Sequence, residues 1–111
     1  MQPCGNMTQK TLSLQTRLIA EETDELMEAT RQMAFNLDNR RVRSACLKEL
    51  ADVAYVCYQL AAAVGWDLDE ALNRVHTSNM SKLVDGKPIK DEFGKIQKSK
   101  NYQPPSLLDL A

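Results

Sequence analysis

The sequence predicts a single all-α domain over residues 1–111, with a bundle of three main helices in residues about 10–83 and an irregular tail in residues 84–111. Two observations favour this fold class. Apolar residues recur at spacings of three and four in long segments, as on the buried side of a helix. No stretch shows the alternation that could build a sheet. A length of 111 residues suits one compact domain.

The first helix is expected over residues about 10–35, because apolar side chains recur there at helical spacings. Its stripe consists of Leu14, Leu18, Leu26, Ala29 and Met33. The polar turn NLDNR (36–40) should end this helix, and Asp38 or Asn39 can cap the helix that follows.

The second helix is expected over residues about 40–64, and Gly65 is typical of a residue just past a helix C-terminus. Its second half is apolar on nearly every side, so it should be the most buried element. Two neighbouring helices cannot cover that much apolar surface. A partner chain is therefore expected to complete the bundle, as a homodimer or a dimer of dimers.

The third helix should begin after Asp67, which can act as N-cap with Glu70 at the third helical position. It continues toward residue 82, where the segment DGKP (85–88) breaks it. The remaining residues include Gly94 and two consecutive prolines. We expect an extended tail there, with a short hairpin around Gly94.

The charge of the chain is nearly balanced but unevenly placed. With a formal net charge of −1, no global field attracts nucleic acid or a membrane surface, and neither is expected as a partner. Residues 21–28 carry five acids and no base, whereas residues 82–100 carry six lysines and three acids. This contrast suggests a ligand with both a metal and phosphates. Solvated helix faces and a lysine-rich tail are the plainer alternative.

The three cysteines indicate a reducing, cytoplasmic setting. Cys46 and Cys57 lie on one expected helix, about 16 Å apart at ~1.5 Å per residue, beyond disulfide reach. Cys4 forms no CxxC motif with them. The first ten residues lack the apolar core of a signal peptide. Residues 51–64 are too short for a membrane span and contain polar side chains.

Two pairs of acidic residues interrupt the apolar stripes of the first two helices. The stripes run Leu18, Glu22, Glu25, Ala29, Met33 and Ala45, Glu49, Asp52, Val56, Leu60. Each helix therefore contributes two carboxylates, one turn apart, that should point inward. A single pair of this kind usually lies on an exposed helix face, but two pairs on facing helices favour a shared site.

Buried carboxylates without partners destabilise a fold by several kcal/mol, so something must compensate them. No Lys or Arg is expected on these faces, since Lys48 is adjacent to Glu49 in sequence and should point elsewhere. A divalent cation is the simplest compensation. Because every candidate ligand is a hard oxygen, the pattern favours Mg²⁺ or Mn²⁺ over Zn²⁺.

The segments EETDE (21–25) and ELAD (49–52) together resemble the EExxE…ExxD pattern of the MazG-like, all-α nucleoside triphosphate pyrophosphohydrolases. The two halves are separated by 23 residues. HTSNMSK (76–82) and the tail that follows are similar to segments of small stand-alone members. The resemblance covers the three expected helices, roughly residues 10–83.

The resemblance implies metal-dependent hydrolysis of a (deoxy)nucleoside triphosphate between the α- and β-phosphates, giving monophosphate and pyrophosphate, for control of the nucleotide pool. By motif position, the Mg²⁺ ligands would be Glu22, Glu25, Glu49 and Asp52. Glu21 would act as a catalytic residue that orients and deprotonates the attacking water, or would sit behind the ligands.

Substrate contacts are expected from the third helix and the tail. Polar Asn79 and Lys82 continue the stripe of Leu68, Leu72 and Val75 and could meet phosphates or sugar. The resemblance supports Asn79 as a substrate contact, and its alternative is a helix-end residue that satisfies backbone carbonyls. For Lys82 the alternative is a solvated cation in the last turn, favourable to the helix dipole. His76, the only histidine, is a further candidate whose alternative is a structural role.

The tail segment KSKNYQPP places Lys98 near Tyr102 and could fold over bound phosphates as a lid. Its alternative is a tail ordered by contact with a partner subunit.

Two rival functions remain open on the sequence. Phosphoribosyl-ATP pyrophosphohydrolases share the fold and the cleaved bond, and the sequence does not reveal the base-binding pocket. A non-catalytic helical interaction module would instead use the acids for salt bridges with a partner.

Overall fold

A computed structural model describes residues 8–98 and 100–111 of the chain. Its helices are α1 (Gln9–Ala34), α2 (Arg40–Val64) and α3 (Leu68–Met80). Its strands are β1 (Leu83–Val84), β2 (Lys87–Lys90) and β3 (Ile96–Gln97), and a 3₁₀ turn, η1 (Leu108–Leu110), follows. The chain divides into two compact units at residues 66 and 67. Cys4 lies outside the described residues.

Side-chain oxygens cap the starts of both α1 and α2, and a cap had been expected for α2. The Thr8 hydroxyl caps α1 by accepting a hydrogen bond from the Thr11 N–H at 3.1 Å. Of the two candidate caps for α2, Asn39 is the one used. Its Oδ1 accepts from the N–H of Arg41 at 3.0 Å and of Val42 at 3.2 Å. These contacts satisfy N–H groups that have no partner within the helix.

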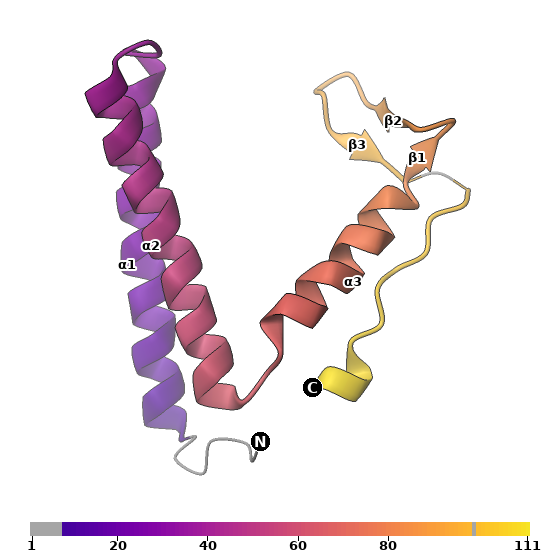
Figure 1. Cartoon of the computed structure of the whole chain (residues 1–111), viewed down its shortest axis with the longest axis horizontal. Helices are drawn as coiled ribbons and strands as arrows, with labels where there is room; N and C mark the ends of the chain where they lie inside the picture. The colour runs from indigo at the N-terminus through magenta and orange to yellow at the C-terminus, as the bar shows by residue number, and fades with distance from the viewer. Residues whose placement is uncertain (1–7, 99) are drawn as a thin grey trace. The chain divides into compact units, whose positions relative to one another are not determined.

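The first unit is an antiparallel pair formed by α1 and α2, which pack along their length (Figure 1). Among the described residues of this unit, the fully buried side chains all belong to α2: Cys46, Val56 and Ala61, each at most 7% exposed. Other apolar side chains of α2 remain open to solvent, including Leu47 at 66% and Tyr55 at 67%. Two helices therefore leave much of the apolar surface of α2 uncovered, as expected. The partner that would cover it stays a prediction.

The third helix begins as expected and ends slightly early. The Asp67 carboxylate accepts a hydrogen bond from the Glu70 N–H at 3.0 Å. The Glu70 side chain does not return this bond, because its carboxylate pairs with Arg74 at 2.8 Å. The helix stops at Met80 rather than at residue 82.

The expectation of an irregular tail with no sheet is wrong for residues 83–97, which form a three-stranded antiparallel sheet in the order β1-β2-β3 (Figure 1). Asp85 and Gly86 join β1 to β2, with φ of 52° and 75°. Two positive φ values match the twist of a two-residue hairpin turn, and Asp-Gly is a favoured pair for it. The segment that was expected to break the helix therefore forms a hairpin turn instead.

The expected hairpin around Gly94 is confirmed as the connection between β2 and β3. Asp91 closes it: its Oδ1 accepts hydrogen bonds from the N–H groups of Phe93 and Lys95, each at 2.9 Å. Gly94 adopts a φ of 81°. Ile89 faces Gln97 across the strands.

Within residues 8–98 and 100–111, no helix is both long and apolar enough to cross a membrane.

Candidate active site

Three of the four predicted metal ligands come together between α1 and α2. Glu22, Glu25 and Glu49 each offer a carboxylate oxygen, and these oxygens all lie within 4.8 Å of one another. Glu22 and Glu49 are half-buried, with the Glu49 side chain 19% exposed, and Glu25 is exposed. Acidic residues that interrupt the apolar stripes of both helices therefore meet at one place, because their helical spacing puts them on the facing sides.

Two oxygens of this acidic cluster, defined as Glu22, Glu25 and Glu49, are buried without a hydrogen-bond donor from the described chain. They are Glu22 Oε2 and Glu49 Oε2. A buried acceptor that lacks a donor destabilises the fold by its full desolvation penalty. Close carboxylates also repel one another. A hard divalent cation would satisfy both oxygens and offset the repulsion, so the donor set fits Mg²⁺ or Mn²⁺.

Asp52 is not in the acidic cluster, and Lys48 explains what it does instead. Lys48 Nζ lies 2.7 Å from Asp52 Oδ2 and 3.4 Å from Glu49 Oε1. The expectation that Lys48 points away from the acids is wrong. Residues four apart are neighbours on a helix, and a long lysine side chain can also bend toward the residue beside it. Hydrogen bonds to Asp52 and then Glu49 raise the pKa of Lys48.

The remaining acids of α1 lie outside the acidic cluster. Glu21 is exposed, so its predicted catalytic role stays a prediction. Glu28 receives hydrogen bonds from Gln32 at 3.2 Å and Arg31 at 3.0 Å, which lower its pKa. Glu28 and Arg31 form a surface ion pair, of the kind that contributes little to stability.

A polar residue that the sequence analysis missed also lies on α1. Gln15 Oε1 is buried with no hydrogen-bond partner in the described chain. Gln15 precedes Glu22 by seven residues, which is about two helical turns, so both side chains leave the same side of α1. Extending the interrupted stripe back by one turn from Leu18 would have found it.

In the second unit, Lys82, Lys98 and Tyr102 lie together, and we call them the dilysine–tyrosine cluster. Lys82 Nζ is 5.5 Å and Lys98 Nζ is 5.0 Å from the centre of the Tyr102 ring. Both are within the range of a cation–π interaction. Three of the predicted substrate contacts are thus neighbours. The other two, Asn79 and His76, are exposed on α3.

Comparison with known proteins identifies the family of this chain. Residues 2–79 match the family described as phosphoribosyl-ATP pyrophosphohydrolase. The chain belongs to this family. The match confirms the resemblance carried by the two acidic motifs.

A viral protein is also similar, though over a short stretch. Over an alignment 47 residues long, the chain is 47% identical to the "Uncharacterized protein L479" of Acanthamoeba polyphaga mimivirus. The match covers 36% of this chain and only 19% of the viral protein. It therefore spans well under two thirds of that relative.

The pyrophosphohydrolase match includes the acidic cluster but ends at residue 79, before the sheet and the C-terminal segment. That segment is anchored on α3 by residues of which the sequence analysis had named only Glu70, and that one for helix capping. Their spacings of four, four and three place them on one side of the helix, and we call them the polar track. The polar track consists of Glu70, Arg74, Ser78 and Ser81.

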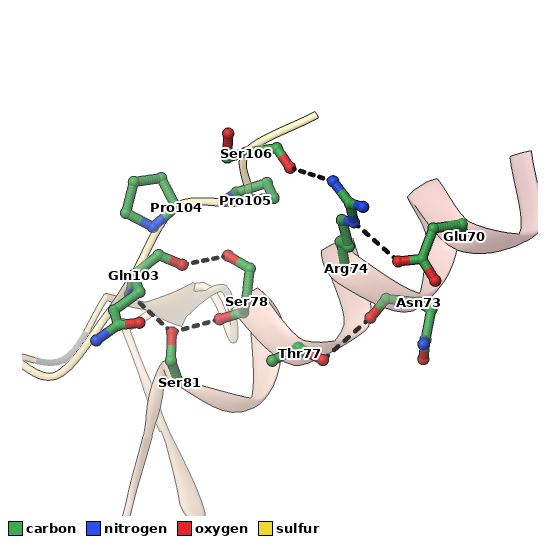
Figure 2. A pocket seen from close by; sticks show the side chains of 10 residues that line it. All are labelled: Glu70, Asn73, Arg74, Thr77, Ser78, Ser81, Gln103, Pro104, Pro105 and Ser106. Carbon is green, nitrogen blue, oxygen red and sulfur yellow. Dashed lines mark hydrogen bonds and ion pairs between the residues drawn. The ribbon is translucent and has the colours of Figure 1, made fainter. Parts of the chain in front are cut away.

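The polar track holds residues 103–109 at two points (Figure 2). Ser78 Oγ donates to the Gln103 carbonyl at 2.6 Å, and the Gln103 N–H donates to Ser81 Oγ at 2.8 Å. Arg74 Nη1 and Nη2 donate to the two carboxylate oxygens of Asp109 at 2.6 and 3.0 Å. Hydrogen bonds to Asp109 and then Glu70 raise the pKa of Arg74, and the bonds from Arg74 lower the pKa of Asp109.

Proposed function

We propose that this chain hydrolyses (deoxy)nucleoside triphosphates to monophosphate and pyrophosphate, with a divalent cation held by Glu22, Glu25 and Glu49. One observation carries the proposal: the acidic cluster contains two buried oxygens without a donor, in a member of a pyrophosphohydrolase family. The hard-oxygen donor set favours Mg²⁺, with Mn²⁺ as the substitute.

When bound, such a cation would neutralise charge on phosphate oxygens and make water more acidic. The protein supplies the orientation. Lys48 binds Glu49 Oε1 and leaves Glu49 Oε2 for the ion. In this proposal Asp52 is a further ligand that Lys48 holds close to the site, and Glu21 orients and deprotonates the attacking water.

The substrate contacts in this proposal are Asn79, His76 and the dilysine–tyrosine cluster. The supporting observation is that two lysine ammonium groups gather at one aromatic ring in a chain whose expected ligand carries phosphates. Lysine binds phosphate as a point charge and does not require a fixed geometry.

A homodimer or a dimer of dimers is the proposed assembly. The support is the exposed apolar surface of the first unit, including Leu47, Leu50 and Tyr55 on α2. Sedimentation at micromolar concentration should give at least a dimer. A fully active monomer would contradict this part of the proposal.

Phosphoribosyl-ATP is the second candidate substrate, because the matching family carries that description. The deciding experiment incubates the protein with Mg²⁺ and each of the eight common NTPs and dNTPs, and with phosphoribosyl-ATP, and measures pyrophosphate. Release from a nucleoside triphosphate supports the first proposal, and release from phosphoribosyl-ATP alone supports the second. No release from any of them, with folded protein, would favour a non-catalytic interaction module.

A further inference from the structure

The dilysine–tyrosine cluster concentrates positive charge with no carboxylate to balance it. Neither Lys82 nor Lys98 forms an ion pair within the described part of the chain. The Tyr102 ring stabilises each ammonium group through the negative potential of its face. Two like charges near one ring also repel each other. An anion that contacts both lysines would therefore bind more tightly than an anion that contacts only one of them.

The position of Tyr102 is set by the residue after it. Both backbone polar groups of Gln103 are bound by hydroxyls of the polar track, Ser78 and Ser81. Ser78 is 5% exposed and is the one polar side chain in the described residues that is fully buried. Ser81 in turn donates to the Ser78 carbonyl at 2.6 Å. These three bonds fix residue 103 against the end of α3 and against Ser81, which is the residue before Lys82.

A second anchor keeps the same segment from leaving α3. Arg74 donates to the Ser106 carbonyl at 3.2 Å, and its Nε is held by Glu70 at 2.8 Å (Figure 2). It also donates to both carboxylate oxygens of Asp109. A planar guanidinium bound on three sides is well ordered. The C-terminal segment is therefore held on both sides of the two consecutive prolines.

We propose that Lys82, Lys98 and Tyr102 form a binding site for an oligophosphate anion, and that Ser78 is its positioning residue. Inorganic pyrophosphate is the simplest ligand of this class, because it offers two linked phosphoryl groups to two ammonium groups. The inference rests on the proposed function only for the choice of ligand class.

The first test measures binding of inorganic pyrophosphate to the full chain by titration calorimetry in EDTA. Lys82→Gln and Lys98→Gln should each weaken binding by about tenfold, as expected for loss of a charge-assisted contact. Lys90→Gln is the matched control, since it removes the same charge from the neighbouring sheet. Equal losses for all three variants would indicate general attraction by the basic surface and overturn the site. Orthophosphate that binds as tightly as pyrophosphate would overturn the ligand class.

The second test separates the ring from its support. Tyr102→Phe keeps an aromatic face and should bind pyrophosphate within about twofold of wild type, whereas Tyr102→Leu should lose about fivefold or more. Ser78→Ala should also weaken binding, but it should have no further effect in the Tyr102→Leu background. The same loss in both backgrounds would show that Ser78 acts only on the fold, and would overturn its positioning role.

Binding in EDTA and hydrolysis in Mg²⁺ fail independently. A wild-type protein that releases pyrophosphate from nucleotides but does not bind it in EDTA would overturn the inferred site and leave the proposed function standing. A protein that binds pyrophosphate as described and hydrolyses nothing would do the reverse.

Discussion

The acidic cluster and the dilysine–tyrosine cluster deal with like charges in different ways. In the acidic cluster, carboxylates from two packed helices meet, and two of their oxygens are buried without a donor. In the dilysine–tyrosine cluster, the cations lie near an aromatic ring, and both backbone polar groups of the next residue, Gln103, are hydrogen-bonded. The first arrangement leaves buried acceptors unsatisfied, and the proposed cation would stabilise it. The second has its neighbouring backbone already hydrogen-bonded, so the proposed oligophosphate would need to order little of the chain.

The largest expected effect comes from Glu49→Gln, which removes a charge but keeps the shape. If Glu49 holds the cation, turnover should fall on the order of a hundredfold or more. In EDTA the urea midpoint should stay the same or rise, because repulsion among the acids is relieved. Loss of the Lys48 contact should matter little, since that side chain is 66% exposed.

Glu28→Gln is the matched control for this variant, because it removes an acid of α1 that lies outside the acidic cluster. It should leave turnover unchanged. A Glu49→Gln protein that loses roughly 3–5 kcal/mol in EDTA would contradict the metal site, because a loss of that size marks a broken buried ion pair.

Metal binding should stabilise the protein only through the acidic cluster. At a hundred times its dissociation constant, Mg²⁺ or Mn²⁺ should add about 2.7 kcal/mol to the free energy of unfolding. Calorimetry with and without EDTA measures this as a rise in the thermal midpoint. The rise should be lost in Glu49→Gln and kept in Lys82→Gln. A midpoint that does not respond to millimolar metal in wild type would count against the site.

A smaller effect is expected from Lys48→Met. Removing this ammonium group should increase Mn²⁺ affinity by severalfold, because a positive charge is removed from beside Glu49 and Asp52. Lys10→Met, at the start of α1, removes the same charge far from the acids and should change nothing. Weaker Mn²⁺ binding in Lys48→Met would mean that the orientation of Asp52 and Glu49 by Lys48 matters more for the ion than the repulsion from its charge. Titration calorimetry distinguishes the two signs.

The smallest effect concerns how firmly the C-terminal segment (residues 103–109) is held on α3 at acidic pH. Arg74 lowers the pKa of Asp109 below its ordinary value of 3.8. The stabilisation from this pair is therefore fully present above the ordinary pKa, and it is lost as pH falls through the lowered pKa. The amide signals of Gln103 and of residues 106–109 should shift over that acidic range in wild type. Asp109→Asn should show no such transition, and an identical transition in both proteins would exclude Asp109 as its cause.

The acidic cluster was largely predictable, because it depends on regular helix geometry. A period of 3.6 residues places Glu22 and Glu25 on one face and Glu49 on another, and the two helices needed only to pack. Lys48 was mispredicted for a reason of scale. Adjacent side chains leave a helix in directions that differ by about 100°. A long flexible lysine side chain can nevertheless bend across that angle.

The sheet and the anchored segment were not predictable from periodicity. Strands of two to four residues are too short to show alternation. Only the turn residues Asp85 and Gly86 indicate the β1–β2 hairpin in the sequence. The bonds from Arg74 to Asp109 and from Ser78 to Gln103 join residues 35 and 25 positions apart. No local pattern encodes such distant pairs. The one-sided spacing of the polar track indicated only that this face of α3 had some partner.

The guanidinium of Arg74 limits how this region can change over evolution. It uses three nitrogens to reach Glu70, Ser106 and Asp109. Lysine keeps the charge but has one nitrogen, so the common exchange of arginine for lysine would abandon part of this set. A lineage that first loses Asp109 would release most of that restraint. We therefore expect positions 74 and 109 to be substituted together among related sequences, with arginine kept wherever the aspartate is kept.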